Sequence, residues 1–195
     1  MKSKQRSSVR IIAGNKKGSR IPFPDIRGLR PSGDRVREML FAWLQTSISG
    51  CDVLDMFAGS GALGFESASR GARRVVMLEK NITAVDALKK NCERLDFSQV
   101  AIHAADATDD RIYTNALVSD NRFDLILIDP PFDAQLTQSS VDLVQRLQLL
   151  RGDGFVYVES DKRHNSLHLP DNWELHREKV AGEVKVCLYR VIAAG

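Results

Sequence analysis

The amino-acid sequence predicts an α/β fold built on a mostly parallel sheet. From residue 51 onward, short apolar runs alternate with segments of helical period. The runs are continuously apolar, as in strands that are covered on both faces. They alternate with helices in the order strand–helix–strand, which is typical of an open α/β sheet.

The elements follow in order along the chain. An amphipathic helix is predicted over Asp34–Thr46, with Ser32 or Asp34 as its N-terminal cap. Before it, residues 9–28 predict a small hairpin or an extended arm. The predicted strands are Val53–Leu54, Val75–Leu78, Val100–Ile102, Leu125–Ile128 and Phe155–Val158. The helices between them are Ala62–Arg70, Ile82–Leu95, Arg111–Leu117 and Thr137–Leu150.

The C-terminal segment departs from this alternation. Trp173–Val180 and Glu183–Val191 predict two strands joined by a tight turn. The second strand alternates, with Val184, Val186 and Leu188 on one face and Glu183, Lys185 and Cys187 on the other. Alternation indicates an antiparallel strand with one polar face. The sequence therefore predicts a parallel sheet that ends in an antiparallel hairpin.

Composition limits the class of protein. The chain has 195 residues and a formal net charge of +3, but residues 1–38 alone hold eleven Lys or Arg against three acidic residues. A basic arm on a slightly acidic body is typical of nucleic-acid binding, although a solvated tail has the same composition. The chain holds no apolar stretch long enough for a membrane span or signal peptide, so we expect a cytoplasmic protein. The three cysteines lack metal-ligand spacing, so we expect no metal site.

The strongest local motif is Asp55–Glu66, which follows the first strand and opens the first helix. Gly59 and Gly61 allow a ligand to approach the backbone closely. The spacing also fits a dinucleotide-binding fingerprint, so an oxidoreductase is an alternative. Asp55 argues against it, because a carboxylate disfavours a pyrophosphate and favours the sulfonium and amino group of S-adenosylmethionine.

Two further acidic residues end strands in the same way. Glu79 follows Val75–Leu78, where a carboxylate accepts hydrogen bonds from ribose hydroxyls. Asp106 follows the third strand, where it would accept from an adenine amino group. Acids at successive carboxyl ends of a parallel sheet converge on one crevice, which favours a cationic nucleoside cofactor.

The second strong motif is Asp129-Pro130-Pro131-Phe132, directly after Leu125–Ile128. Two prolines stiffen the loop and leave carbonyl oxygens free to accept hydrogen bonds. An amino group donating to the Asp129 carboxylate and the Pro130 carbonyl would aim its nitrogen lone pair at a methyl donor. Phe132 would stack on the base that carries the amine.

These motifs resemble the cofactor loop and the (Asp/Asn)-Pro-Pro-(Phe/Tyr/Trp) motif of class I amino-methyltransferases. The N-terminal segments narrow the resemblance to the RsmD family of bacterial 16S ribosomal RNA guanine-N2 methyltransferases. They are Arg10-Ile11-Ile12-Ala13-Gly14, Lys17-Gly18 and Arg30-Pro31-Ser32-Gly33-Asp34-Arg35-Val36-Arg37-Glu38. The family usually has Thr-Ser or Thr-Thr where this chain has Ser32-Gly33. The resemblance covers residues 9–192.

The resemblance implies a Rossmann-like sheet of seven strands, the last antiparallel. It implies a basic RNA-contacting arm over residues 1–33 and a methyltransferase domain over 34–195. Its cofactor residues would be Asp55, Phe57, Ala58, Gly59, Ser60, Gly61, Glu79, Lys80, Asp106 and Ala107. Asp129, Pro130, Pro131 and Phe132 would hold the target base. RNA contacts would come from Arg10, Lys16, Lys17, Arg20, Arg30, Arg35 and Arg37.

The expected reaction is direct methyl transfer from S-adenosylmethionine to the N2 amine of a guanine, of the guanine-966 type. The expected partner is 16S rRNA within the small ribosomal subunit or an assembly intermediate, and we expect a monomer. The Asp129 motif itself does not separate this substrate from adenine N6 in DNA or RNA, or from a protein glutamine. A non-catalytic RNA-binding or assembly protein is the remaining alternative.

Overall fold

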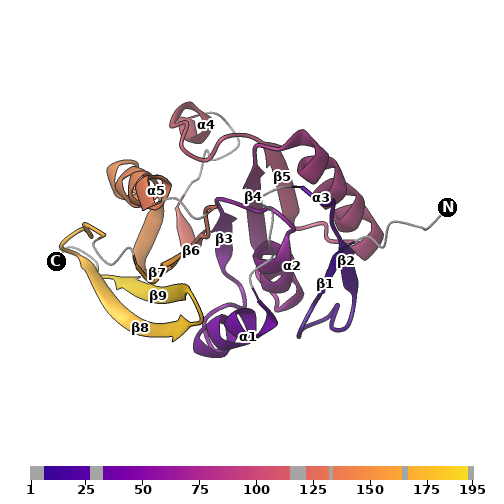
Figure 1. Ribbon diagram of the computed structural model, residues 1–195, viewed down its shortest axis with the longest axis horizontal. Helices are drawn as coiled ribbons and strands as arrows, with labels where there is room; N and C mark the ends of the chain where they lie inside the picture. The colour runs from indigo at the N-terminus through magenta and orange to yellow at the C-terminus, as the bar shows by residue number, and fades with distance from the viewer. Residues whose placement is uncertain (1–6, 27–32, 115–121, 132–133, 164–166, 193–195) are drawn as a thin grey trace.

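The computed structural model describes residues 7–26, 33–114, 122–131, 134–163 and 167–192. Its centre is a seven-stranded sheet with the strand order β5-β4-β3-β6-β7-β9-β8 (Figure 1). The elements are β1 (Ser8–Arg10), β2 (Arg20–Pro22), α1 (Asp34–Trp43), β3 (Asp52–Asp55), α2 (Ala62–Ser69), β4 (Arg74–Glu79), α3 (Ile82–Leu95), β5 (Val100–Ala104), α4 (Arg111–Thr114), β6 (Phe123–Ile128), α5 (Ala134–Arg146), β7 (Leu150–Asp161), β8 (Trp173–Ala181) and β9 (Val184–Val191). The predicted α/β fold is confirmed.

Strand directions place five strand ends at one edge of the sheet. Strands β3 to β7 pair in parallel, and β9 runs antiparallel to both of its neighbours, β7 and β8. The carboxyl ends of β3, β4, β5, β6 and β7 therefore lie along one edge, which we name the carboxyl edge. The chain moves outward from β3 to β5 and then returns to β6 beside β3. Such a switch in strand order is where open α/β sheets bind ligands.

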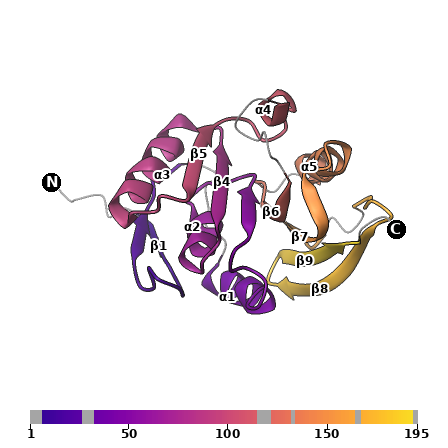
Figure 2. The same cartoon turned by 180° about the vertical axis from the view of Figure 1, so that it is seen from behind.

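Two apolar layers cover the sheet. Leu125, Leu127 and Tyr157 face a core shared with α1, α2, α3 and the β1–β2 hairpin. The alternate residues, such as Ile126 and Val156, face a second core shared with α4 and α5. Figures 1 and 2 show the hairpin beside α3 at one end of the molecule and the β8–β9 pair at the other. Among the described residues, the helices are too short or too polar to cross a membrane.

The N-terminal segment forms a hairpin that is attached firmly to α2. Ile12 and Ala13 donate their backbone N–H groups to the carboxylate of Glu66 at 2.7 and 3.0 Å. Gly14 has a φ of +85°, and a Cβ there would lie 1.8 Å from the carbonyl oxygen of Ser69. Only glycine fits this contact, so the turn of the hairpin can lie directly on α2.

Several predicted helix boundaries are wrong. α1 ends at Trp43 instead of Thr46, and α5 begins at Ala134 instead of Thr137. α5 ends at Arg146 instead of Leu150, because Leu150 begins β7 and pairs with Phe123. The N-terminal cap of α1 is Gly33, without a side-chain hydrogen bond. Asp34 does not cap the helix, because its carboxylate accepts a hydrogen bond from Arg37 at 2.6 Å. The cap predicted at Ser32 and the helix end predicted at Leu117 lie outside the described residues.

The predicted hairpin of β8 and β9 is confirmed, but the expected polar face of β9 is wrong. Val186 and Leu188 pack in the first core, while Cys187 and Tyr189 pack in the second. The middle of β9 is covered on both faces, because the two cores lie on opposite faces of the sheet at this strand. The exposed apolar residues lie instead on β8. This strand forms the edge of the sheet and carries Leu175 and Val180.

Candidate active site

Acidic side chains gather at the carboxyl edge. Asp55 and Glu79 are the last residues of β3 and β4, and Asp106 lies two residues beyond β5. Asp129 directly follows β6, and Glu159 lies near the end of β7. The structure therefore brings the acids predicted from the sequence to one edge and adds Glu159 to them. Among the described residues, no group of three or more His, Cys, Asp or Glu side chains is arranged to hold a metal ion.

The glycine loop, residues 56–61, turns sharply between β3 and α2. Gly59 and Gly61 have φ values of +51° and +81°. A Cβ on Gly61 would lie 2.5 Å from the ring of Phe65, so this position requires glycine. Ala58 donates its N–H to the carbonyl of Leu78 at 2.9 Å, which ties the loop to β4. The loop is thus a rigid backbone surface at the switch point.

Asp55 is a buried acid with an unused oxygen. The residue is 1% exposed, and its Oδ2 accepts the N–H of Gly64 at 3.0 Å. Its Oδ1 is buried without a hydrogen-bond partner among the described residues. Burial, followed by the charge of Asp129, raises the pKa of Asp55 to about 7. A buried polar atom without a partner is costly, so this oxygen fits a ligand that brings a positive charge or a hydrogen-bond donor.

Glu79 supports the glycine loop from the neighbouring strand. Its Oε2 accepts the N–H of Gly59 at 2.9 Å, and its Oε1 accepts the N–H of Asn81 at 2.7 Å. The Asn81 side chain in turn caps α3. Each carboxylate oxygen can accept a further hydrogen bond, so Glu79 can both shape the loop and bind hydroxyl groups.

Asp106 has a different environment, because it is exposed beyond β5. Its Oδ1 accepts the backbone N–H and the hydroxyl of Thr108 at 3.0 and 2.7 Å. These hydrogen bonds hold the pKa of Asp106 below its ordinary value. Asp106 is therefore an ionised acceptor at the rim of the site. The other residues predicted to bind the cofactor lie in the loops after β3, β4 and β5: Phe57 is half-buried, Ala58, Ser60 and Ala107 are buried, and Lys80 is exposed.

The Asp-Pro-Pro loop, residues 129–131, follows β6 at the centre of the edge. Asp129 is half-buried, Pro130 is buried and Pro131 is exposed. Asp55 pairs with Leu127 in the β3–β6 ladder, so Asp129 lies just beyond Asp55 along the adjacent strand. The charge of Asp129 raises the pKa of both Asp55 and Glu159. Phe132, the last residue of the predicted motif, lies outside the described residues.

Glu159 is a site residue that the sequence reasoning missed. It is 7% exposed, and its Oε2 accepts the hydroxyl of Tyr157 at 2.9 Å. The signal was available, because Glu159 follows an apolar strand just as Glu79 does. Applying the same strand-end rule to Phe155–Val158 would have added Glu159 to the predicted site.

The predicted RNA-contacting residues differ in exposure. Arg10, Lys17, Arg20 and Arg35 are exposed, Lys16 is half-buried, and Arg30 lies outside the described residues. Arg37 contradicts the expectation, because its side chain is 0% exposed and lies 3.6 Å from the buried carboxylate of Glu66. Its guanidinium also donates to the carbonyl of Arg10 at 3.1 Å. Arg37 therefore joins the hairpin to α1 and α2, and it presents no surface to RNA.

The fold and the site together define a class of protein. A mostly parallel seven-stranded sheet with an antiparallel last strand, and a glycine loop flanked by acids, is the class I methyltransferase fold. A solved structure described as a putative methyltransferase from Escherichia coli is 34% identical, with a TM-score of 0.87 over 96% of this chain and 100% of that one. A 16S rRNA N2 methyltransferase of Thermus thermophilus, solved in complex with AdoMet and guanosine, is 25% identical, with a TM-score of 0.65 over 96% of this chain and 50% of that one.

The sequence comparisons narrow the class to a family. Residues 9–190 match the family model described as conserved hypothetical protein 95. The ribosomal RNA small subunit methyltransferase D of Haemophilus influenzae is 38% identical over 187 residues, which is 95% of either chain. The chain belongs to the ribosomal RNA small subunit methyltransferase D family.

Proposed function

We propose that the chain transfers a methyl group from S-adenosylmethionine to the N2 amine of a guanine in 16S rRNA. One observation carries this proposal: the unpartnered Oδ1 of Asp55 and the Asp-Pro-Pro loop lie at the ends of adjacent strands. A site for a cationic donor would then lie beside a site for an amine. The names of the family relatives support rRNA as the substrate, and the AdoMet and guanosine bound in the Thermus thermophilus structure support the donor and the base.

The residues of the donor site fit S-adenosylmethionine. When bound, this group supplies a methyl group carried on a positively charged sulfur. The Asp55 carboxylate would balance the positive charge of the ligand in a site of low dielectric constant. Glu79 and Asp106 would accept hydrogen bonds from the ribose hydroxyls and the adenine amino group. The backbone of the glycine loop would let the ligand approach closely, because Gly59 and Gly61 carry no side chain.

The residues of the acceptor site would orient the amine. The Asp129 carboxylate and the Pro130 carbonyl would accept the two hydrogens of the amino group, and its lone pair would then point toward the donor site. Phe132 would stack on the base. Orientation of two reactants accounts for roughly 7–11 kcal/mol of a barrier, so Asp129 acts by positioning and by dispersing developing positive charge. We propose direct transfer to nitrogen, without a covalent enzyme intermediate.

Basic residues outside the site would bind the rRNA. Arg10, Lys17 and Arg20 project from the hairpin, and Arg35 projects from the first turn of α1. Lysine and arginine contacts to phosphates release condensed counterions, so this surface would bind RNA in a salt-dependent way. Residues 1–33 would then act as an RNA-contacting arm and residues 34–195 as the methyltransferase domain. We further propose that the chain acts as a monomer on the small subunit or an assembly intermediate.

A methyl-transfer assay with labelled S-adenosylmethionine tests the proposal. The substrates are small ribosomal subunits that lack the modification, free 16S rRNA and a DNA control, and the product is identified by nucleoside analysis. We expect label in N2-methylguanosine from 16S rRNA. Label in N6-methyladenine would replace the proposed substrate by adenine. Label in protein glutamine, or in no acceptor despite binding of S-adenosylmethionine, would overturn the proposal.

A further inference from the structure

Glu159 lies beside the proposed acceptor site. Ile128 and Val158 are register partners in the parallel β6–β7 pair, so Asp129 and Glu159 come next on adjacent strands. Neighbouring strands lie about 4.8 Å apart, and equivalent residues point to the same face of a sheet. The two acids also interact electrostatically, because the charge of Asp129 disfavours ionisation of Glu159. A base held at Asp129 would therefore present its adjacent ring atoms to Glu159.

The orientation of Glu159 is fixed by a buried tyrosine. Tyr157 is 0% exposed, and its hydroxyl donates to Oε2 of Glu159 at 2.9 Å. This hydrogen bond occupies one carboxyl oxygen and leaves Oε1 for another donor. Because the Tyr157 side chain is packed in the first core, the carboxyl group that it contacts has a defined direction.

Stability does not explain a carboxyl group in this position. Burial, followed by the charge of Asp129, raises the pKa of Glu159 to about 8. In the described part of the chain, Glu159 forms no ion pair. A buried acid without a cation costs stability. Such a residue at a ligand edge is a candidate for recognition.

Guanine and adenine differ at the ring atom beside the amine. Guanine carries a proton on N1, next to its N2 amine, whereas N1 of adenine is an acceptor next to its N6 amine. An oxygen acceptor beside Asp129 would bind the N1–H of guanine and repel the N1 lone pair of adenine. We propose that Glu159, oriented by Tyr157, is the specificity-determining residue that accepts the guanine N1–H and so selects guanine. This inference rests on the proposed function, because it concerns the base held at Asp129.

When Glu159 is ionised, Tyr157 donates to Oε2 and Oε1 accepts the guanine N1–H, so this role belongs to the ionised form of the carboxyl group. Tyr157 is a positioning residue that acts through Glu159. Its own hydroxyl is buried and donates to Glu159.

A substituted substrate tests the inference without altering the protein. Small subunits are reconstituted with 16S rRNA in which the target guanine is replaced by 2,6-diaminopurine, which keeps the N2 amine and lacks the N1 proton. Single-turnover methyl transfer by the unchanged protein is expected to be about 10- to 100-fold slower on this base than on guanine, because two acceptors then face each other. Equal rates on the two bases would overturn the inference.

Variants sharpen the test. In Glu159→Gln the Tyr157 hydroxyl holds the amide oxygen, so the amide N–H faces the base. The preference for guanine over 2,6-diaminopurine should then fall to about unity or reverse. Adding Tyr157→Phe frees the amide to rotate and should restore part of the guanine rate. Tyr189→Phe is the matched control. It removes the hydroxyl of a buried tyrosine that packs in the second core, away from Tyr157, and it should keep the original preference.

The outcomes separate the inference from the proposed function. A Glu159→Gln variant that binds S-adenosylmethionine normally and keeps the original base preference would overturn the inference alone, provided that the unchanged protein forms N2-methylguanosine. Absence of N2-methylguanosine with the unchanged protein would overturn the proposed function first.

Discussion

The two aspartates at the ends of β3 have opposite electrostatic environments. Asp52, at the start of the strand, is 4% exposed and meets Arg73 at 2.8 Å and Arg151 at 3.1 Å. Burial opposes its ionisation, but the hydrogen bonds from these arginines hold the pKa of Asp52 below its ordinary value. Asp55, three residues later, is 1% exposed, and within the described part of the chain its Oδ1 has no hydrogen-bond partner. Burial raises the pKa of Asp55 to about 7.

The difference separates a structural acid from a functional one. Arg73 directly precedes β4, Arg74 begins it and Arg151 lies in β7, so Asp52 links β3 to these two strands. Such compensation stabilises the fold and leaves Asp52 little capacity for a ligand. Asp55 lacks that compensation, so its burial costs stability in the protein alone. Binding of a cationic ligand would offset this cost.

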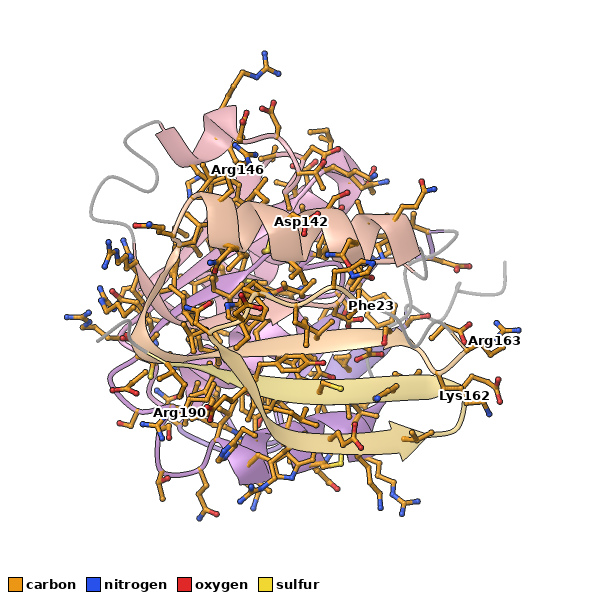
Figure 3. The ribbon with its side chains drawn as sticks, turned by 90° about the vertical axis from the view of Figure 1, so that its left-hand side faces the viewer. Phe23, Asp142, Arg146, Lys162, Arg163 and Arg190 are labelled. Carbon is orange, nitrogen blue, oxygen red and sulfur yellow. The ribbon has the colours of Figure 1, made fainter. Side chains whose placement is uncertain are left out.

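Figure 3 views the β7–β9–β8 end of the sheet, with Lys162 and Arg163 where β7 ends and Arg190 at the opposite end.

The largest expected effect is on catalysis at the carboxyl edge. Asp129→Ala removes the acceptor that orients the amine, so methyl transfer should fall about 1,000-fold. Binding of S-adenosylmethionine, measured by calorimetry, should change less than about threefold, because Asp129 does not contact that ligand in our proposal. Asp142→Ala on α5 is the control and should keep full activity. Normal turnover by Asp129→Ala would contradict the proposed role.

The next effect concerns a fully buried acid that is compensated. Glu66 accepts hydrogen bonds from Arg70 and from the hairpin, and it lies 3.6 Å from the buried Arg37. Glu66→Gln removes the buried negative charge that Arg37 and Arg70 share, so the free energy of unfolding should fall by about 3 kcal/mol. Asp55→Asn is the matched variant and should cause no such loss. Equal losses in urea denaturation would remove the distinction between the two acids.

The uncompensated acids also predict a pH dependence of stability. The pKa of Asp55 rises from 3.8 to about 7, and that of Glu159 rises from 4.5 to about 8. Between these values the folded protein binds more protons than the unfolded chain, so the free energy of unfolding falls as the pH rises. We expect a fall of at least about 2 kcal/mol from pH 5 to pH 8 relative to the double variant Asp55→Asn/Glu159→Gln. Parallel profiles of the two proteins would contradict the raised pKa values.

The smallest effect concerns Asp52. Its arginine partners are between one third and two thirds exposed, so water already screens part of the interaction. Asp52→Asn should therefore lower the free energy of unfolding by about 1 kcal/mol. Binding of S-adenosylmethionine should remain unchanged, as thermal shifts with and without the ligand would show. Loss of S-adenosylmethionine binding in Asp52→Asn would contradict the account, because Asp52 would then take part in binding the ligand.

Local patterns predicted the elements near the site, and contacts between distant segments explain what was missed. The run Leu125–Ile128 and the motif after it placed β6 and Asp129 correctly, because both depend on neighbouring residues. The buried state of Arg37 depends on Glu66, which is distant in the sequence. A helical pattern does not distinguish an exposed arginine from a buried one. The burial of Arg37 and the exposure of Arg35 are therefore known only from the folded structure.

The error in β9 has a related cause. Alternation of Val186 and Cys187 predicted one polar face, which is correct for an edge strand. In the structure the second core, which includes residues of α5, covers the face that carries Cys187 and Tyr189, so these residues are buried as well. The order and covering of the strands depend on the whole sheet, so a local sequence pattern does not predict them.

The most direct test of the account is the pKa of Asp55, measured by NMR from its carboxyl carbon in the protein alone and with S-adenosylmethionine. We predict a pKa of about 7 in the protein alone and a decrease when the cationic ligand binds, while Asp52 titrates below its ordinary value in both states. An Asp55 that titrates near 3.8 in the protein alone, or that does not respond to the ligand, would contradict the assignment of the carboxyl edge as the methyl-donor site.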